Sequence, residues 1–256
     1  MRFCLAELQL TGVIRYFAPM KHQAALFWSG GKDSAYALYH VLKHYPELEI
    51  VLLITTVNAE YKRISMHGVR EALLETQAKE TGIPLYKMIV ANSPSNNVYE
   101  DELSRTLNEL KERGISHIVF GDIFLEDLRE YRLKFLSEHG LEGVFPLWKK
   151  DTSQLIQSFL ELGFRTITCC ISSAFLDEKF VGKEIDAEFL KNLPTNVDPC
   201  GENGEFHTFC FDGPIFKNSI SYTPGEKVYK PLTINTCHDT QETGFWYIDL
   251  MSAFSV

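Results

Sequence analysis

The sequence lacks paired cysteines and an excess of positive charge. Its six cysteines form no CxxC motif, which argues against a zinc ribbon and against a thioredoxin-like redox pair. The formal net charge is -9, whereas a broad surface for a phosphate backbone needs clustered lysine and arginine. Nucleic acid is therefore not an expected partner, although the net charge does not exclude a local basic cleft.

A long apolar segment is also missing. The most hydrophobic run, Ile50–Val57, has the length of a strand and is too short to span a bilayer. The N-terminus shows neither the apolar block nor the small-residue cleavage site of a signal peptide. We therefore expect a cytoplasmic protein with reduced cysteines and no membrane contact. Whether it forms a homo-oligomer is left open.

Short apolar runs alternate with helical patterns after Met20. The pattern predicts strands at Ala24–Trp28, Glu49–Val57, Leu85–Val90 and Ile115–Phe120, and helices at Ser34–His44, His67–Thr81, Val98–Arg113 and Leu125–His139. Such alternation indicates βαβ units, and continuous apolar strands indicate a parallel sheet covered by helices on both faces. The fold class is therefore α/β and Rossmann-like.

The alternation loosens near Pro146. A helix from Asp151 or Thr152 to Leu162 and strands at Arg165–Ile171 and Glu205–Phe211 predict a smaller α+β lobe over residues 146–235. Residues 20–145 form the expected nucleotide-binding domain. Residues 1–19 are interpreted as a non-essential N-terminal extension, and residues 236–256 as a C-terminal tail.

A Gly-rich motif, SGGKDS, lies between the first strand and the first helix. Gly30 and Gly31 let backbone N–H groups approach an anion, and the helix N-terminus adds donors and a positive dipole end. Lys32 supplies a mobile cation and Ser29 and Ser34 supply hydroxyls. Asp33 is a candidate Mg²⁺ ligand. A capped turn in a non-catalytic α/β protein is the alternative.

The motif differs from Walker A, because Leu26 and Asp33 stand where that pattern needs glycine and a hydroxyl. It resembles the PP-loop, SGGxDS, of the ATP pyrophosphatase families, which cleave ATP to AMP and pyrophosphate. That resemblance implies ATP as the nucleotide and Mg²⁺ as its metal.

Further motifs narrow the resemblance. DPCGENGEFHTFCFDGPIF at Asp198–Phe216 resembles the GExGEYHT signature of the diphthine–ammonia ligase family, and Gly121–Arg132, Phe145–Ile156 and Leu176–Asp186 fall where that family has its other elements. The resemblance implies an enzyme that adenylates a carboxylate, releases pyrophosphate and forms an amide with ammonia. The acidic stretch after Ile123 departs from the family's GAIxSxYQxxR pattern. The resemblance therefore supports the family's type of reaction for this chain more strongly than it supports the family's substrate.

The first group of further candidates follows strand ends in the nucleotide-binding domain. His67 is a candidate nucleotide contact or a solvent-facing helix-start residue. Gly121 and Asp122 end a strand, where open α/β sheets bind ligands, and Asp122 either holds Mg²⁺ with Asp33 or caps a helix. Arg132 matches the family's arginine, and its planar guanidinium suits a phosphate or carboxylate.

The second group lies in the GENGEFH segment. Gly201 and Gly204 permit a tight turn that presents Glu202 and Asn203 to substrate, and Glu205 and His207 are expected on one face of a strand as general base or ammonium ligands. An ordinary turn and strand is the alternative.

Two other functions remain open. A tRNA-modifying PP-loop enzyme of the thiolase type is disfavoured by the missing cysteine pairs and basic domain. A non-catalytic ATP-binding sensor is disfavoured by the intact SGGKDS.

Overall fold

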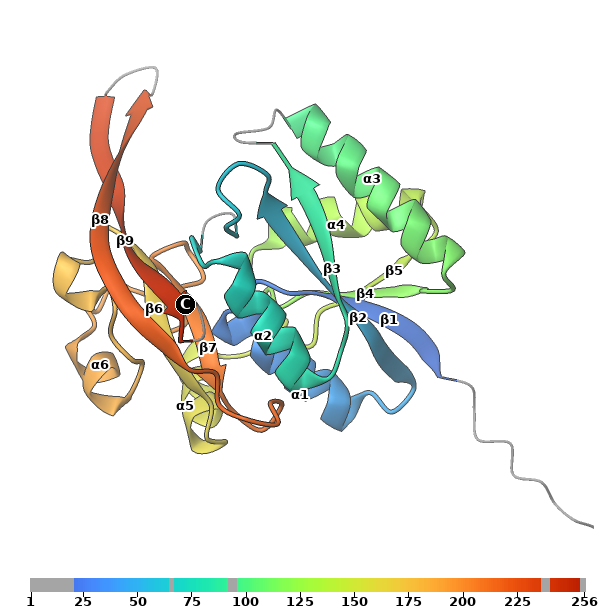
Figure 1. Ribbon diagram of the computed structural model, residues 1–256, viewed down its shortest axis with the longest axis horizontal. Helices are drawn as coiled ribbons and strands as arrows, with labels where there is room; N and C mark the ends of the chain where they lie inside the picture. Colours follow the sequence, from blue (N-terminus) through green and yellow to red (C-terminus); the bar gives the residue numbers. More distant parts are fainter. Residues whose placement is uncertain (1–20, 65–66, 92–95, 236–239, 254–256) are drawn as a thin grey trace, which may run out of the picture.

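The computed structural model describes residues 21–64, 67–91, 96–235 and 240–253. The expected N-terminal extension, residues 1–19, lies outside them. The chain forms two sheets with helices between and outside them (Figure 1). The first sheet contains β1 (His22–Phe27), β2 (Leu48–Asn58), β3 (Leu85–Val90), β4 (His117–Val119) and β5 (Glu142–Val144).

The first sheet is parallel throughout, in the order β3-β2-β1-β4-β5. The chain moves outward from β1 to β3 and then returns to place β4 on the other side of β1. The order of the strands therefore reverses between β1 and β4, and open α/β sheets bind ligands at the carboxyl ends of the strands at such a point. The α/β Rossmann-like prediction is confirmed.

Both faces of β1 are buried, which explains its continuous apolar sequence. Ala24, Leu26 and Trp28 pack in one core cluster with α1 (Lys32–His44) and α2 (Glu71–Thr81). Ala25 packs on the opposite face with α3 (Asn96–Glu112) and α4 (Glu126–Glu138). Because successive strand residues point to opposite faces, helices on both sides require apolar residues at every position from Ala24 on, whereas His22 and Gln23 at the start of β1 are exposed.

The second sheet is antiparallel and has the order β7-β6-β9-β8. Its strands are β6 (Arg165–Ser172), β7 (Phe206–Asp212), β8 (Tyr222–Asn235) and β9 (Thr240–Ser252), and it is accompanied by α5 (Thr152–Glu161), the 3₁₀ helix η1 (Glu178–Phe180) and α6 (Ala187–Asn192). Helices α1 and α2 lie between the two sheets (Figure 1). Asp151 caps α5 as expected, with its side chain accepting a hydrogen bond from the Gln154 N–H at 2.8 Å.

Two sequence predictions need correction. The expected tail is wrong for residues 240–252, because β9 lies inside the second sheet between β6 and β8. The helix predicted from His67 begins only at Glu71. Gly68 is left-handed, with φ at +68°, and Arg70 is extended and bridged to Arg63, so the helical pattern of residues 67–70 is overridden.

None of the described helices has the length and apolar character needed to cross a bilayer. The described cysteines, Cys169, Cys170, Cys200 and Cys210, are buried free thiols.

Candidate active site

A cavity of about 860 Å³ lies at the carboxyl ends of the parallel strands. Its walls come from the ends of β1 to β4, from helices α3 and α4, and from β7 and the turn before it. It therefore lies at the point where the strand order reverses, and both sheets contribute to it. The predicted site residues that line it are Ser29, Asp33, Ser34, His67, Gly121, Asp122, Arg132, Gly201, Glu202, Asn203, Gly204 and His207.

The Ser29–Ser34 loop is held by hydrogen bonds within itself. The Ser29 hydroxyl accepts from the Gly31 N–H at 3.2 Å and lies 3.2 Å from the Ser34 hydroxyl, which donates to the Gly31 carbonyl at 3.0 Å. Gly30 is left-handed, with φ at +77°, and a Cβ there would lie 2.5 Å from Gln77 Oε1. Glycine is thus required at this position both by conformation and by space.

Two residues that the sequence analysis missed fix the loop to its surroundings. Gln77 donates to the carbonyls of Gly30 and Cys210 at 2.9 and 2.7 Å, and accepts from the Trp28 indole at 2.9 Å. Thr208 on β7 accepts from the Lys32 N–H at 3.0 Å. The loop is therefore tied to the second sheet through buried hydrogen bonds. Gln77 lies within α2, and no motif distinguished it from an ordinary core polar residue. Thr208 belongs to the segment that resembles the GExGEYHT signature, but it was not singled out as a site residue.

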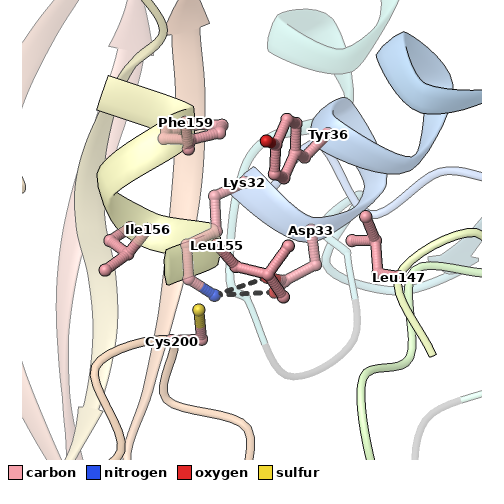
Figure 2. Close-up of a pocket in the computed structure, with 8 residues that line it drawn as sticks. All are labelled: Lys32, Asp33, Tyr36, Leu147, Leu155, Ile156, Phe159 and Cys200. Carbon is pink, nitrogen blue, oxygen red and sulfur yellow. Dashed lines mark hydrogen bonds and ion pairs between the residues drawn. The ribbon is translucent and has the colours of Figure 1, made fainter. Parts of the chain in front are cut away.

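Lys32 does not line the large cavity, and it is less mobile than the sequence suggested. Its ammonium is buried and donates to both Asp33 carboxylate oxygens, at 2.7 and 2.8 Å. Figure 2 shows this ion pair with the Cys200 thiol beside the ammonium and apolar side chains of α5 nearby. Burial lowers the pKa of Lys32, but Asp33 and other nearby groups outweigh this and raise it, so the amine stays charged.

Cys200 lines the small apolar pocket around Lys32. Burial raises the pKa of its thiol to about 12 despite the nearby lysine, and the thiol donates to the Thr152 carbonyl at 3.3 Å. A protonated, hydrogen-bonded thiol is a poor nucleophile. Cys200 therefore acts as a packing residue.

Asp122 and Arg132 form an ion pair in the cavity wall. The Arg132 guanidinium donates to both Asp122 oxygens, at 2.8 and 2.5 Å, and lies 4.3 Å from the Phe120 ring centre. Burial raises the pKa of Asp122 more than Arg132 lowers it, and the charge of Asp33 raises it further. The two expected Mg²⁺ ligands, Asp33 and Asp122, thus face one cavity, each already paired with a cation.

Gly121 brings the end of β4 against the nucleotide loop. A Cβ at this position would lie 2.8 Å from the Asp33 carbonyl carbon and 3.0 Å from the Ser34 nitrogen. The backbone neighbours cannot rotate away as a side chain would. Gly121 is therefore needed for the close approach of the two segments that follow β1 and β4.

Glu202 points into the cavity and joins the two lobes. Its Oε1 accepts from the Ile123 N–H at 2.7 Å and from the Phe124 N–H at 3.3 Å. Burial and the charge of Asp33 raise the pKa of Glu202 to about 7, although these hydrogen bonds and Lys32 lower it. A carboxyl with this pKa exchanges a proton readily near neutral pH.

Glu205 is placed differently from its prediction. It is buried and precedes β7, and its carboxylate accepts from the N–H groups of Asp198 and Asn203 at 3.0 and 2.9 Å and from the Asn203 amide at 3.0 Å. It does not belong to the cavity lining. The turn's own donors are its nearest partners, and this geometry favours a structural role for Glu205 over the expected catalytic one.

His207 lies on β7 and faces the cavity, with its ring beside that of His67 in a tilted arrangement, ring centres 4.7 Å apart. Burial, with a smaller effect from Lys32, lowers the pKa of His207 to about 4. Its Nε2 is buried and, among the described residues, has no hydrogen-bond partner. A neutral imidazole with an unsatisfied nitrogen beside a phosphate-type loop is suited to contact a polar ligand.

The described residues contain no group of three or more histidine, cysteine or acidic side chains placed to hold a metal. A divalent ion at Asp33 and Asp122 would therefore need ligands from a bound molecule or water. Mg²⁺ commonly binds in this way, through one or two carboxylates together with phosphate oxygens.

Comparisons with known proteins cover most of the chain. Residues 21–142 match the diphthamide synthase N-terminal domain, and residues 151–239 match the diphthamide synthase C-terminal domain. A diphthine–ammonia ligase of Bos taurus is 24% identical over 233 residues, which cover 80% of this chain and 85% of the relative. The ligase of Schizosaccharomyces pombe is 24% identical over 217 residues, 78% of this chain but only 36% of the relative.

Among solved structures, a U34-tRNA thiolase from Methanococcus maripaludis is 18% identical, with a TM-score of 0.34, and the likeness covers 56% of this chain and 59% of the thiolase. A likeness this weak says nothing about activity. The two domain matches follow the order of the two sheets described above, except that β9 of the second sheet lies beyond the second match. The chain belongs to the diphthamide synthase family, whose curated relatives are diphthine–ammonia ligases.

Proposed function

We propose that this chain is an ATP-dependent ligase that adenylates a carboxylate and then converts it to an amide with ammonia. The observation that carries the proposal is the shared cavity. Three residues of the nucleotide loop line this space together with the Asp122 carboxylate, Glu202 and His207, which come from distant parts of the sequence. The loop residues are Ser29, Asp33 and Ser34. Since the relatives are named diphthine–ammonia ligases, the proposed acid is a carboxylate of the diphthine type.

In the first half-reaction a carboxylate oxygen attacks the α-phosphorus of ATP, and pyrophosphate leaves. The positive end of α1 suits the leaving phosphates, whereas the Gly31 and Lys32 N–H groups already donate to Ser29 and Thr208. Lys32 adds a positive charge behind the loop. Asp33 and Asp122 would hold Mg²⁺, which when bound neutralises phosphate charge.

In the second half-reaction the ammonia nitrogen attacks the acyl carbon, and AMP leaves. The attacking species must be neutral ammonia, so a base has to take a proton from ammonium. Glu202 is the proposed base, because it faces the cavity and its pKa of about 7 suits proton transfer near neutral pH. His207, with a pKa of about 4, stays neutral and is proposed to position the ammonia or the acyl-adenylate by a hydrogen bond.

The described cysteines give no support to a thiolase-type reaction, because none of them belongs to the lining of the large cavity. A non-catalytic sensor would bind ATP without cleaving it.

The test is product analysis with Mg·ATP, ammonium and candidate carboxylates. We expect AMP, pyrophosphate and an amide from the wild-type chain and from Lys179→Ala, which changes an exposed lysine, but far less from Lys32→Ala. ADP and orthophosphate as the main products would refute the proposed reaction. Tight ATP binding without any cleavage would favour the sensor.

A further inference from the structure

The segment between β2 and α2 folds back on itself and carries His67 to the site. We call residues 58–64 and 67–70 the His67 hairpin. The Asn58 N–H donates to the Arg63 carbonyl at 2.9 Å, and the Ile64 N–H donates to the Val69 carbonyl at 2.9 Å. The His67 ring lies beside the His207 ring at a tilt of 41°, and its Nε2 lies 3.2 Å from the place a Cβ on Gly31 would occupy. His67 therefore lies against both the nucleotide loop and β7.

One carboxylate on β9 binds two arginines of this hairpin. Asp249 accepts from Arg63 Nη1 at 2.9 Å, and from Arg70 Nε and Nη2 at 3.0 and 2.6 Å. The same Arg63 nitrogen donates to the Gly68 carbonyl at 2.7 Å, so the contact extends to the residue beside His67. Tyr247 packs on Gly68, where a Cβ would lie 2.9 Å from its ring.

The clamp formed by Arg63, Arg70 and Asp249 is charged near neutral pH. Hydrogen bonds from Arg70, and then from Arg63, lower the pKa of Asp249 to about 2 despite its partial burial. The arginines are 32% and 45% exposed, and isolated pairs of this kind contribute little to stability. The contact of Asp249 with Arg70 is bidentate, and Asp249 also binds Arg63. Such a contact fixes the relative positions of its side chains in addition to stabilising them. Asp249 also lies beyond the matched range 151–239.

We propose that Asp249 is a positioning residue, which holds the His67 hairpin so that His67 stays against the nucleotide loop and His207. The inference rests on the proposed function in one respect, namely that the Ser29–Ser34 loop binds ATP. Strand β9 of the second sheet thereby shapes a site whose nucleotide loop belongs to the first. If Asp249 formed only a surface ion pair, its replacement would lower stability and leave the position of His67 unchanged.

The first test does not need ATP. In protein labelled at its eight histidines, nuclear Overhauser contacts between the His67 and His207 rings should be present in the wild-type chain. They should be lost in Asp249→Asn, weakened in Arg70→Gln, which keeps the Arg63 contact, and restored in Asp249→Glu. Glu184→Gln is the matched control, because Glu184 pairs with Arg165 in the same two-nitrogen geometry elsewhere. Survival of the ring contact in Asp249→Asn would overturn the proposal.

The second test is a double-mutant cycle on Mg·ATP affinity. Asp249→Asn should weaken binding roughly three- to tenfold, the effect expected when two partly exposed ion pairs are lost together. In a His67→Ala background the same change should cost less than about twofold, because coupled residues are not additive. Equal losses in both backgrounds would contradict a role through His67. Absence of ATP binding by the wild-type chain would refute the proposed function, and the ring contacts would still decide the role of Asp249.

Discussion

Glu202 allows a test of the site that depends on stability alone. Its ordinary pKa is 4.5, and in the fold the pKa is raised to about 7 by burial and by the charge of Asp33. A carboxyl whose pKa rises on folding stabilises the fold in its protonated form. This contribution is fully present below pH 4.5 and is lost as the pH rises through about 7.

The size of the effect follows from the two pKa values. A tenfold change in proton affinity corresponds to about 1.4 kcal/mol, so between pH 5 and pH 8 the ionisation of Glu202 should lower the free energy of unfolding by about 2–3 kcal/mol. Glu202→Gln retains an oxygen that can accept from the Ile123 and Phe124 N–H groups but does not ionise. The difference in stability between the wild-type chain and this variant should therefore change by that amount.

The assay is urea unfolding at several pH values, followed by tryptophan fluorescence. Subtracting the variant from the wild-type chain removes the contributions of the titrating groups that do not interact with Glu202. Glu188→Gln, at an exposed position outside the cavity, is the control for the loss of a surface carboxylate. A difference for Glu202→Gln that is constant with pH would show that the Glu202 carboxyl is not perturbed, and the assignment of Glu202 as the base for ammonium would lose its basis. If that assignment is right, amide formation by the wild-type chain should rise through about pH 7, and this rise should disappear in Glu202→Gln.

Three further predictions concern the nucleotide loop and its supports. Lys32→Ala should slow pyrophosphate exchange into ATP by about a hundredfold, because a preorganised charge near the leaving group is lost. His207→Ala should retain this exchange and lose amide formation. Equal loss of exchange in both variants would place His207 in the first half-reaction. Gly121→Ala should lower the free energy of unfolding by about 1–3 kcal/mol through overpacking against backbone and weaken ATP binding; unchanged denaturation and ATP titration curves would contradict this close contact. Gln77→Leu should destabilise the chain by about 2–4 kcal/mol in urea unfolding, because three buried polar partners lose their hydrogen bonds; a stability like that of the wild-type chain would mean that the loop does not depend on Gln77.

Local patterns predicted the parts of the site that depend on neighbouring residues in the chain. A buried strand, two glycines and a helix start placed Ser29–Ser34 at the end of β1, and the same logic placed Asp122 at the end of β4. Glu202 and His207 came from a family resemblance, and both face the cavity.

The remaining features depend on contacts that residue patterns do not reveal, and most of these contacts join residues far apart in the sequence. The carboxylate of Glu205 turns toward the donors of its own turn, which residue spacing alone does not reveal. Strand β9 is defined by its pairing with β6 and β8. Only the fold brings Asp249 of this strand into contact with the His67 hairpin. Gln77 resembles any polar helix residue until its partners at Gly30 and Cys210 are known.

The position of β9 has a consequence for the order in which the protein is made. The five strands of the first sheet lie within residues 22–144, so this sheet can form early during synthesis, since domains fold as units from the N-terminal side. The second sheet has to wait for residues 240–252, because β9 separates β6 from β8. Until then the His67 hairpin lacks its Asp249 contact. A growing chain should therefore form its first sheet well before it acquires a complete active site.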